Sequence, residues 1–266
     1  MSRHFVTSLL AVMLSFAFVG AEEATPPVNA TPPIKVLYIT GGAFHDYKKM
    51  TPLFKESMEK YANMKIDVID DEAVIGKTMK DPKLGEGYDV IVYNICVHIG
   101  NGPVDNAIPS AMEVIKNGKP AMMIHCSMHS FRVGDEWGEC CGLVTKVHDG
   151  FRGFGTVKAT PEHPIVKAFP NDWKTSGDEL YQNIKFPETS IPLLRAHSTQ
   201  SDKDHVVAWV HTFGKGNVFG TTLGHDMKTF AQPEFLQMLA NGLLWTVGKL
   251  GDDGKPLKGF GGTESK

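Results

Sequence analysis

Short apolar runs alternate with amphipathic stretches along the first half of the chain. Residues 34–39 form an apolar, β-branched run that ends at Thr40, Gly41 and Gly42, which is typical of a buried parallel strand followed by a turn. At 48–62 the apolar side chains recur at helical spacing, and 65–69 returns to a strand pattern. The pattern predicts a β-α-β unit with a right-handed crossover.

The alternation continues with a strand at 88–94, an amphipathic helix at 104–117 and a strand at 119–124. Parallel strands that alternate with helices predict an α/β fold with a doubly wound, mostly parallel sheet flanked by helices. After residue 133 the sequence pattern changes to glycines, aromatic residues and short strand-like segments around 142–159 and 191–220. We expect these segments to be antiparallel additions or an extension of the sheet, followed by a last helix at 233–250.

The N-terminal residues have the pattern of a signal peptide. A short basic start precedes the apolar run 6–19, and small residues follow up to Ala21. That run is shorter than the roughly 20 residues a membrane-spanning helix needs. We therefore expect a signal peptide at 1–21, a proline-rich linker at 22–33, one domain at 34–250 and a flexible tail at 251–266. The protein would be periplasmic or secreted after cleavage near Ala21, with no membrane span.

Composition narrows the set of partners. The 266 residues are 42% hydrophobic, and the formal net charge of −3 comes from interspersed acids and lysines. Without a basic stripe, we expect no nucleic-acid partner. The four cysteines, Cys96, Cys126, Cys140 and Cys141, do not form a disulfide framework, so we expect buried free thiols, with one bridge left open.

Histidines are the strongest chemical signal, because several follow predicted strands. Ligands of parallel sheets bind beyond the carboxyl ends of the strands, where such loops converge. The histidines of interest are His45, His125, His129, His148, His163 and His225. We expect acid–base catalysis by His45, His125, His148 and His225 with Asp226, or a zinc-like site at His125, His129 and His225. The alternative for any single histidine is a hydrogen-bonding group of the core or surface.

Other polar and aromatic residues are candidates for holding a substrate. They are Asp46, Arg132, Arg152, Asp178, Glu179, Tyr181 and Trp209. Arginine offers forked donors for sugar or carboxylate oxygens, and an aromatic ring can stack on a pyranose. The structural alternatives are buried ion pairs for the arginines, turns for Asp178 and Asp226, and core packing for Trp209. Cys126 could act as a nucleophile with a nearby histidine, or be a structural thiol.

Four segments of this chain resemble the trehalose-utilisation (ThuA-like) family. They are the Gly-Gly-Ala-Phe-His-Asp of 41–46, the His-Asp-Gly-Phe-Arg-Gly of 148–153, His163 with the Asp-Glu-Leu-Tyr of 178–181, and the Leu-Gly-His-Asp of 223–226. Their order and spacing cover most of 34–250. The resemblance implies a class I glutamine amidotransferase-like, flavodoxin-like fold that lacks the usual triad. The elbow after Ile124 holds His125 where an amidotransferase has its cysteine, and the usual glycines are absent.

The resemblance also implies a link to disaccharides such as trehalose. The leading hypothesis is a carbohydrate-processing enzyme (hydrolase, lyase or isomerase) that acts on a keto-disaccharide by histidine and carboxylate chemistry, with or without a divalent metal such as Zn²⁺. The alternatives are a non-catalytic sugar- or partner-binding protein and a metal-dependent hydrolase of another substrate. No nucleotide-binding motif is present, so we expect no nucleotide cofactor. The resemblance leaves a homo-oligomer open.

Overall fold

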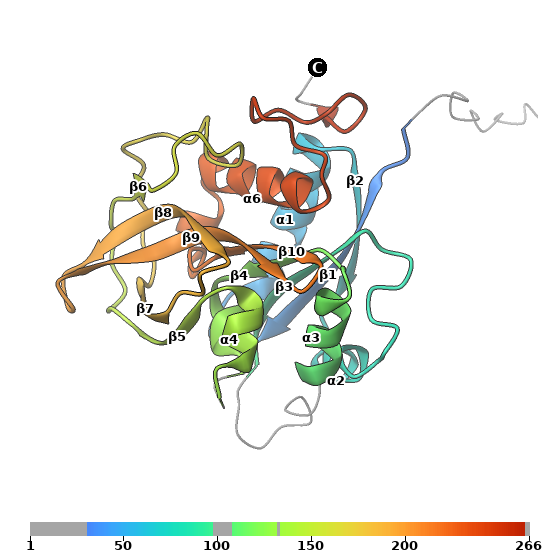
Figure 1. Ribbon diagram of the computed structural model, residues 1–266, viewed down its shortest axis with the longest axis horizontal. Coiled ribbons are helices and arrows are strands. Elements are labelled where there is room, and N and C mark those ends of the chain that lie inside the picture. The colour runs from blue at the N-terminus through green and yellow to red at the C-terminus, as the bar shows by residue number, and fades with distance from the viewer. Residues whose placement is uncertain (1–30, 98–107, 132–133, 264–266) are drawn as a thin grey trace, which may run out of the picture. The chain divides into compact units, whose positions relative to one another are not determined.

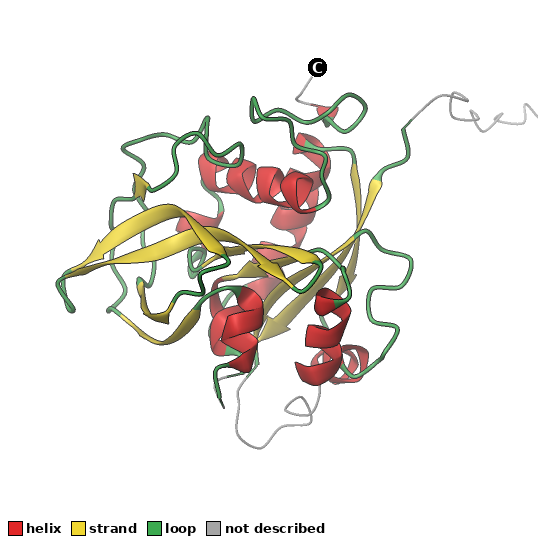
Figure 2. Ribbon diagram, viewed as in Figure 1, coloured by secondary structure: helices red, strands yellow, loops and turns green. Residues whose placement is uncertain are grey.

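The structure, a computed structural model, describes residues 31–97, 108–131 and 134–263. Within them an eight-stranded sheet has the order β2-β1-β3-β4-β10-β9-β8-β6 (Figures 1 and 2). Its strands are β1 (Ile34–Gly42), β2 (Met64–Ile69), β3 (Val90–Cys96), β4 (Ala121–Ile124), β6 (Val157–Lys158), β8 (Ser190–Ser198), β9 (Lys203–Phe213) and β10 (Gly216–Thr221). A separate two-stranded ribbon pairs β5 (Val144–His148) with β7 (Tyr181–Lys185). The helices are α1 (Tyr47–Tyr61), α2 (Glu72–Met79), α3 (Ile108–Lys116), α4 (Glu136–Cys141), α5 (Met227–Phe230), α6 (Pro233–Thr246) and the 3₁₀ helix η1 (His125–His129).

The strand directions confirm the predicted fold class. Strands β2, β1, β3, β4 and β10 are parallel neighbours in that order. Beyond β10, each of β9, β8 and β6 pairs antiparallel with the strand before it. Strand β10 therefore extends the parallel part of the sheet, and β9, β8 and β6 are the antiparallel additions.

Two hydrophobic cores lie on the two faces of the sheet. Along β1, Val36 and Tyr38 belong to one core, and Leu37 and Ile39 belong to the other. This alternation follows from the two-residue period of a strand. Helices α1 and α6 cover the first face, and α2, α3 and α4 cover the second (Figure 1). Cys140 and Cys141 are free and buried in the second core, as expected.

Helix α1 shows how the sequence directs this packing. Asp46 caps its N-terminus by accepting a hydrogen bond from the backbone N–H of Lys49. Met50, Phe54 and Met58 follow at intervals of four residues, and their side chains are buried against the sheet. The helix begins one residue from the predicted position and thereby fixes the loop between β1 and α1.

Some element boundaries differ from those the sequence predicts. Helix α6 ends at Thr246 rather than at residue 250, because Gly248 has a positive φ of 68° that interrupts the helix. Helices α2 and α4 are short, and the sequence pattern does not predict them. Residues 104–107 of the helix predicted at 104–117, the predicted signal peptide 1–21 and most of the predicted linker lie outside the described residues.

The C-terminal segment contacts the domain at several points. Backbone bridges join Ala62 to Gly261 and Leu250 to Pro256, and Phe260 packs against the first core. Across the described ranges we find no helix long and apolar enough to cross a bilayer.

Candidate functional site

A pocket of about 300 Å³ lies where the carboxyl ends of β1, β3, β4 and β10 meet the β5–β7 ribbon. Parallel sheets bind ligands at this edge. Ten residues line the pocket: Phe44, His45, Cys96, Val97, Cys126, His129, His148, Glu179, Tyr181 and His225. Four of the six histidines of interest line this pocket. A fifth, His125, lies directly behind the lining and contacts Tyr181 and His225.

His125 occupies a strained elbow between β4 and η1. Its φ of +48° lies in the left-handed region, which costs a non-glycine residue about 1–3 kcal/mol. Its Nδ1 donates a hydrogen bond to the carbonyl oxygen of Thr222 at 2.6 Å. With Nδ1 as the donor, Nε2 is the atom left to accept or to bind a ligand, and it lies 3.3 Å from both the Tyr181 hydroxyl and Nδ1 of His225. The predicted elbow exists, and it forms without the usual glycines.

A sharp turn after β1 places His45. Gly42 has a φ of +110°, and a Cβ there would lie 2.1 Å from the carbonyl oxygen of Cys96, so this position requires glycine. Nδ1 of His45 donates to the carbonyl oxygen of His225 at 3.1 Å. The Nε2 atom is buried and has no hydrogen-bond partner among the described residues. Burial, with the neighbouring His125 and His225, lowers the pKa of His45 to about 3, so the ring is neutral.

Asp178 fixes the loop that carries His225. The Asp178 carboxylate is fully buried and accepts hydrogen bonds from the backbone N–H groups of Glu179, Gly224 and His225, at 2.8–3.1 Å. Burial raises the pKa of Asp178, although His125 and these N–H groups oppose the shift. Asp178 is therefore a positioning residue and not the substrate ligand we expected, because its oxygens are occupied by backbone.

Glu179 is the carboxylate that faces the pocket histidines. Its Oε2 lies 3.2 Å from Nδ1 of His225 and 3.6 Å from Nε2 of both His125 and His148. Burial alone would raise the pKa of Glu179, but the neighbouring His125 and His225 outweigh it and hold the pKa well below its usual range. Burial alone would lower the pKa of His225, but the Glu179 carboxylate outweighs it and raises that pKa. Glu179 is thus negatively charged among the rings.

Tyr181 contacts both His129 and His125. Its ring stacks on His129 at a centroid distance of 3.8 Å, and its hydroxyl contacts Nε2 of His125. His129 Nε2 lies 3.3 Å from the hydroxyl of Thr145, so His129 lines the pocket without joining the His125–His225 pair. The i, i+4 spacing of His125 and His129 does not bring the two rings together, because the left-handed elbow and the 3₁₀ helix do not keep α-helical faces. His148 donates from Nδ1 to the carbonyl oxygen of Asp149 at 2.8 Å, which leaves Nε2 toward Glu179.

Several expected site residues make structural contacts. Trp209 is fully buried in the second core and donates from its indole N–H to the carbonyl oxygen of Cys141, so it cannot form a sugar platform. Asp46 and Asp226 cap the N-termini of α1 and α5. Arg152 binds Asp149 and the carbonyl oxygen of His197 and is not in the pocket lining.

The remaining two expected residues lie elsewhere. The ring of His163 contacts that of Trp245 rather than the pocket. Arg132 falls outside the described residues.

The structure settles the role of Cys126 and adds two aromatic residues that sequence reasoning missed. Cys96 and Cys126 form a disulfide in the pocket wall, so Cys126 has no thiolate with which to act as a nucleophile. Phe44, with a φ of +71°, lines the pocket and is 70% exposed. The ring of Phe151, also exposed, lies 5.4 Å from the ring of His225. The Gly-Ala-Phe-His and Gly-Phe-Arg segments offered a signal for both phenylalanines, but exposure cannot be read from sequence.

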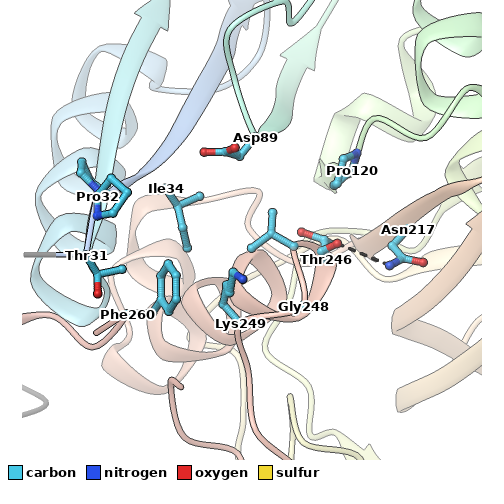
Figure 3. Close-up of a pocket in the computed structure, with 12 residues that line it drawn as sticks. Thr31, Pro32, Ile34, Asp89, Pro120, Asn217, Thr246, Gly248, Lys249 and Phe260 are labelled. Carbon is cyan, nitrogen blue, oxygen red and sulfur yellow. Dashed lines mark hydrogen bonds between the residues drawn. The ribbon is translucent and has the colours of Figure 1, made fainter. Parts of the chain in front are cut away.

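A larger pocket of about 560 Å³ lies at the opposite, amino edge of the sheet (Figure 3). Ile34, Asp89, Pro120 and Asn217 line it at the starts of parallel strands, and Phe260 closes one side. Its charged lining residues, Asp89 and Lys249, do not converge on a common point as the histidines do (Figure 3). The smaller histidine pocket is therefore the candidate functional site.

Comparison with known proteins agrees with the fold. The sequence profile of a family described as trehalose utilisation, ThuA, matches residues 35–246. A ThuA-like protein from Parabacteroides merdae ATCC 43184 superposes with a TM-score of 0.67 at 18% identity, over 88% of this chain and 98% of that one. A second, from Bacteroides uniformis ATCC 8492, gives 0.65 at 17% identity, over 87% and 98%.

A more distant fold neighbour comes from the amidotransferase-like proteins. A GMP synthase component from Thermoplasma acidophilum has a TM-score of 0.52 at 11% identity, over 79% of this chain and 94% of that one. These likenesses confirm the expected ThuA-like, glutamine amidotransferase-like fold. No protein with a curated description matches the chain.

Proposed function

Because the chain belongs to the ThuA family of trehalose utilisation, we propose that it is a carbohydrate-processing enzyme that acts on a ketone derivative of a disaccharide. The observation that carries the proposal is the convergence of His45, His125, His148, His225 and Glu179 on one pocket at the carboxyl edge of the sheet. A pocket of about 300 Å³ suits one sugar ring, with the second ring at the rim.

A ketone on a sugar ring acidifies the neighbouring C–H, so a base in the pocket can start the reaction. We assign this role to His148, whose Nδ1–H is held by the carbonyl oxygen of Asp149 and whose Nε2 carries the lone pair. The lone pair takes the proton, the C–H electrons form a C=C bond with the carbonyl carbon, and the carbonyl π pair moves onto oxygen. Glu179, at 3.6 Å from Nε2, stabilises the imidazolium that results.

The enolate formed in this step has two outcomes. Return of the proton to the other face of the same carbon epimerises the sugar. Its delivery to the former carbonyl carbon moves the ketone, if the hydroxyl proton of the neighbouring carbon passes to the enolate oxygen. Expulsion of an oxygen substituent β to the ketone, which takes up a proton as it leaves, cleaves a bond. The Tyr181 hydroxyl, beside Nε2 of His125, is the group placed to give a proton to a leaving or enolate oxygen.

Aromatic side chains at the rim support a sugar as the substrate. Phe44 and Phe151 are exposed near the pocket, and neither is needed to fill the core. Exposed apolar rings that border a polar pocket are suited to cover the apolar face of a pyranose.

Export is part of the same proposal. The signal-peptide pattern at 1–21 directs the chain out of the cytoplasm. The Cys96–Cys126 bridge supports this placement, because disulfides persist in the periplasm and outside the cell.

The test uses the mature protein, residues 22–266, with trehalose and its 3-keto derivative in separate incubations followed by NMR. We expect conversion of the keto sugar alone, and its loss in His148→Gln. His197→Gln is the matched control, because His197 is exposed on the β8–β9 hairpin away from the pocket. Binding of either sugar without conversion would contradict the enzymatic proposal and favour a sugar-binding protein.

A further inference from the structure

Three pocket histidines come from three separate loops and point ring nitrogens at a common centre. His45 follows β1, His125 follows β4 and His225 follows β10. One ring nitrogen from each lies within 4.8 Å of the other two. Three loops far apart in sequence thus present the same chemical group to one point.

The hydrogen bonds around these rings make the centre a site for a cation. His45 and His125 both donate from Nδ1 to backbone carbonyl oxygens, so their neutral rings present lone pairs from Nε2. The Nε2 atom of His45 is buried with no hydrogen-bond partner among the described residues. Histidines that bind metals are held in this way, with the second ring nitrogen bonded to a carbonyl or carboxylate.

Glu179 adds a negative charge at the spacing of metal ligands. Its Oε2 lies 3.2 Å from Nδ1 of His225 and 3.6 Å from Nε2 of His125, and those two nitrogens are 3.3 Å apart. Tetrahedral zinc with bonds of about 2.0–2.1 Å separates its ligand atoms by about 3.4 Å. The three distances between these atoms are therefore close to those between three ligand atoms of a tetrahedral site.

We propose that His45, His125, His225 and Glu179 bind one divalent transition-metal ion, with Zn²⁺ as the natural occupant. Three imidazoles and one carboxylate favour zinc over Mg²⁺ or Ca²⁺, which take oxygen ligands. The neighbouring cysteines do not compete for the ion, because Cys96 and Cys126 are joined in a disulfide.

The ion deepens the proposed function, on which its catalytic role rests. Held by these residues, the ion would act as a Lewis acid and polarise a substrate carbonyl oxygen in the pocket. Neutral histidine side chains do not supply this positive charge. Binding of the ion itself does not depend on the identity of the sugar.

The experiment measures metal content and affinity rather than turnover. Untagged mature protein is stripped with a chelator, titrated with Zn²⁺, and separately loaded with Co²⁺ for visible absorption. We expect one ion per chain, the intense absorption of tetrahedral cobalt, and a higher melting temperature with metal. In His45→Ala and His225→Ala the dissociation constant should rise at least about tenfold, while His197→Ala matches the wild type.

Circular dichroism of the stripped variants first establishes that each is folded. Absence of stoichiometric metal in the folded wild type, or unchanged affinity in both folded variants, overturns the inference. Metal binding without sugar turnover sinks only the proposed function. Turnover that survives complete removal of metal sinks only the catalytic role of the ion, because binding is measured separately.

Discussion

Nδ1 of His225 lies 3.2 Å from Oε2 of Glu179, although the two residues are 46 positions apart in the sequence. Both are held by one buried carboxylate, because Asp178 accepts hydrogen bonds from the backbone N–H of Glu179 and of His225. The pairing is therefore fixed by backbone contacts rather than by the flexible ends of the side chains. Such a supported arrangement is what a preorganised site requires.

Replacing Glu179 by Gln keeps the shape of the side chain and removes its charge. We expect turnover of the keto sugar to fall by about 100-fold or more, because the charge beside His148, His125 and His225 is lost. Steady-state kinetics check this, with Glu188→Gln, an exposed carboxylate, as control. Equal kinetics in the two variants would remove Glu179 from the site.

Asp178→Asn tests the support of the site. The amide cannot accept at both positions as the carboxylate does, so one backbone N–H near Gly224 or His225 loses its buried partner. We expect the free energy of unfolding to fall by about 1–3 kcal/mol, measured by denaturant titration. Asp172→Asn, at an exposed position, should leave it unchanged. A fully stable Asp178→Asn variant would contradict the positioning role.

The Cys96–Cys126 bridge closes a loop with a sequence separation of 30. Replacing both cysteines by serine should lower the free energy of unfolding by about 2–4 kcal/mol, because the unfolded chain gains freedom. Denaturant unfolding of oxidised protein measures the difference. Adding a reductant should lower the stability of the wild type but not that of the double variant. If reductant has no effect on the wild type, the bridge does not form.

Burial of His211 should make the free energy of unfolding fall at acidic pH. Burial lowers the pKa of His211, so the folded state binds fewer protons than the unfolded state, whose histidine pKa is about 6.5. Its contribution to stability is therefore complete above that pH and is lost as the pH falls below it, by at most about 1.4 kcal/mol per pH unit. His211→Gln should flatten the decline of unfolding free energy between about pH 6.5 and 5. An unchanged slope would show that His211 does not titrate with unfolding.

Phe44→Ala tests the rim. If the exposed ring covers a sugar face, its removal should raise KM by about tenfold and leave kcat close to the wild-type value. The apolar contact is then lost equally from the bound substrate and from the transition state. Ile184→Ala, another exposed apolar position, is the control. A change in kcat alone would assign Phe44 a different role.

Much of the fold could be predicted because its parallel strands are buried on both faces. The runs that form β1, β3 and β4 are mostly apolar, so their carboxyl ends could be located, and with them His45 and His125. The convergence of parallel strand ends then predicts that these residues meet. Glu179 and Tyr181 were candidates from their chemistry and from the segment that resembles the family, without a predicted place in the sheet.

The errors have a common physical origin. Sequence alone does not show that β9 is covered on both faces, so the expectation of a sugar platform at Trp209 is wrong and its ring fills the core. Helical spacing would pair His129 with His125, but the segment is a 3₁₀ helix, and His129 stacks on Tyr181 while His125 contacts the Tyr181 hydroxyl and His225. The bridge between Cys96 and Cys126 depends on how the neighbouring strands β3 and β4 are aligned, which spacing alone does not determine.

The most direct measurement is deuterium exchange from D₂O into 3-keto-trehalose, followed by NMR at the carbon next to the carbonyl. We predict that the mature protein accelerates exchange at that carbon far above buffer, leaves trehalose untouched, and loses the effect in His148→Gln but not in His197→Gln. Binding of the keto sugar with no exchange above buffer would contradict the account.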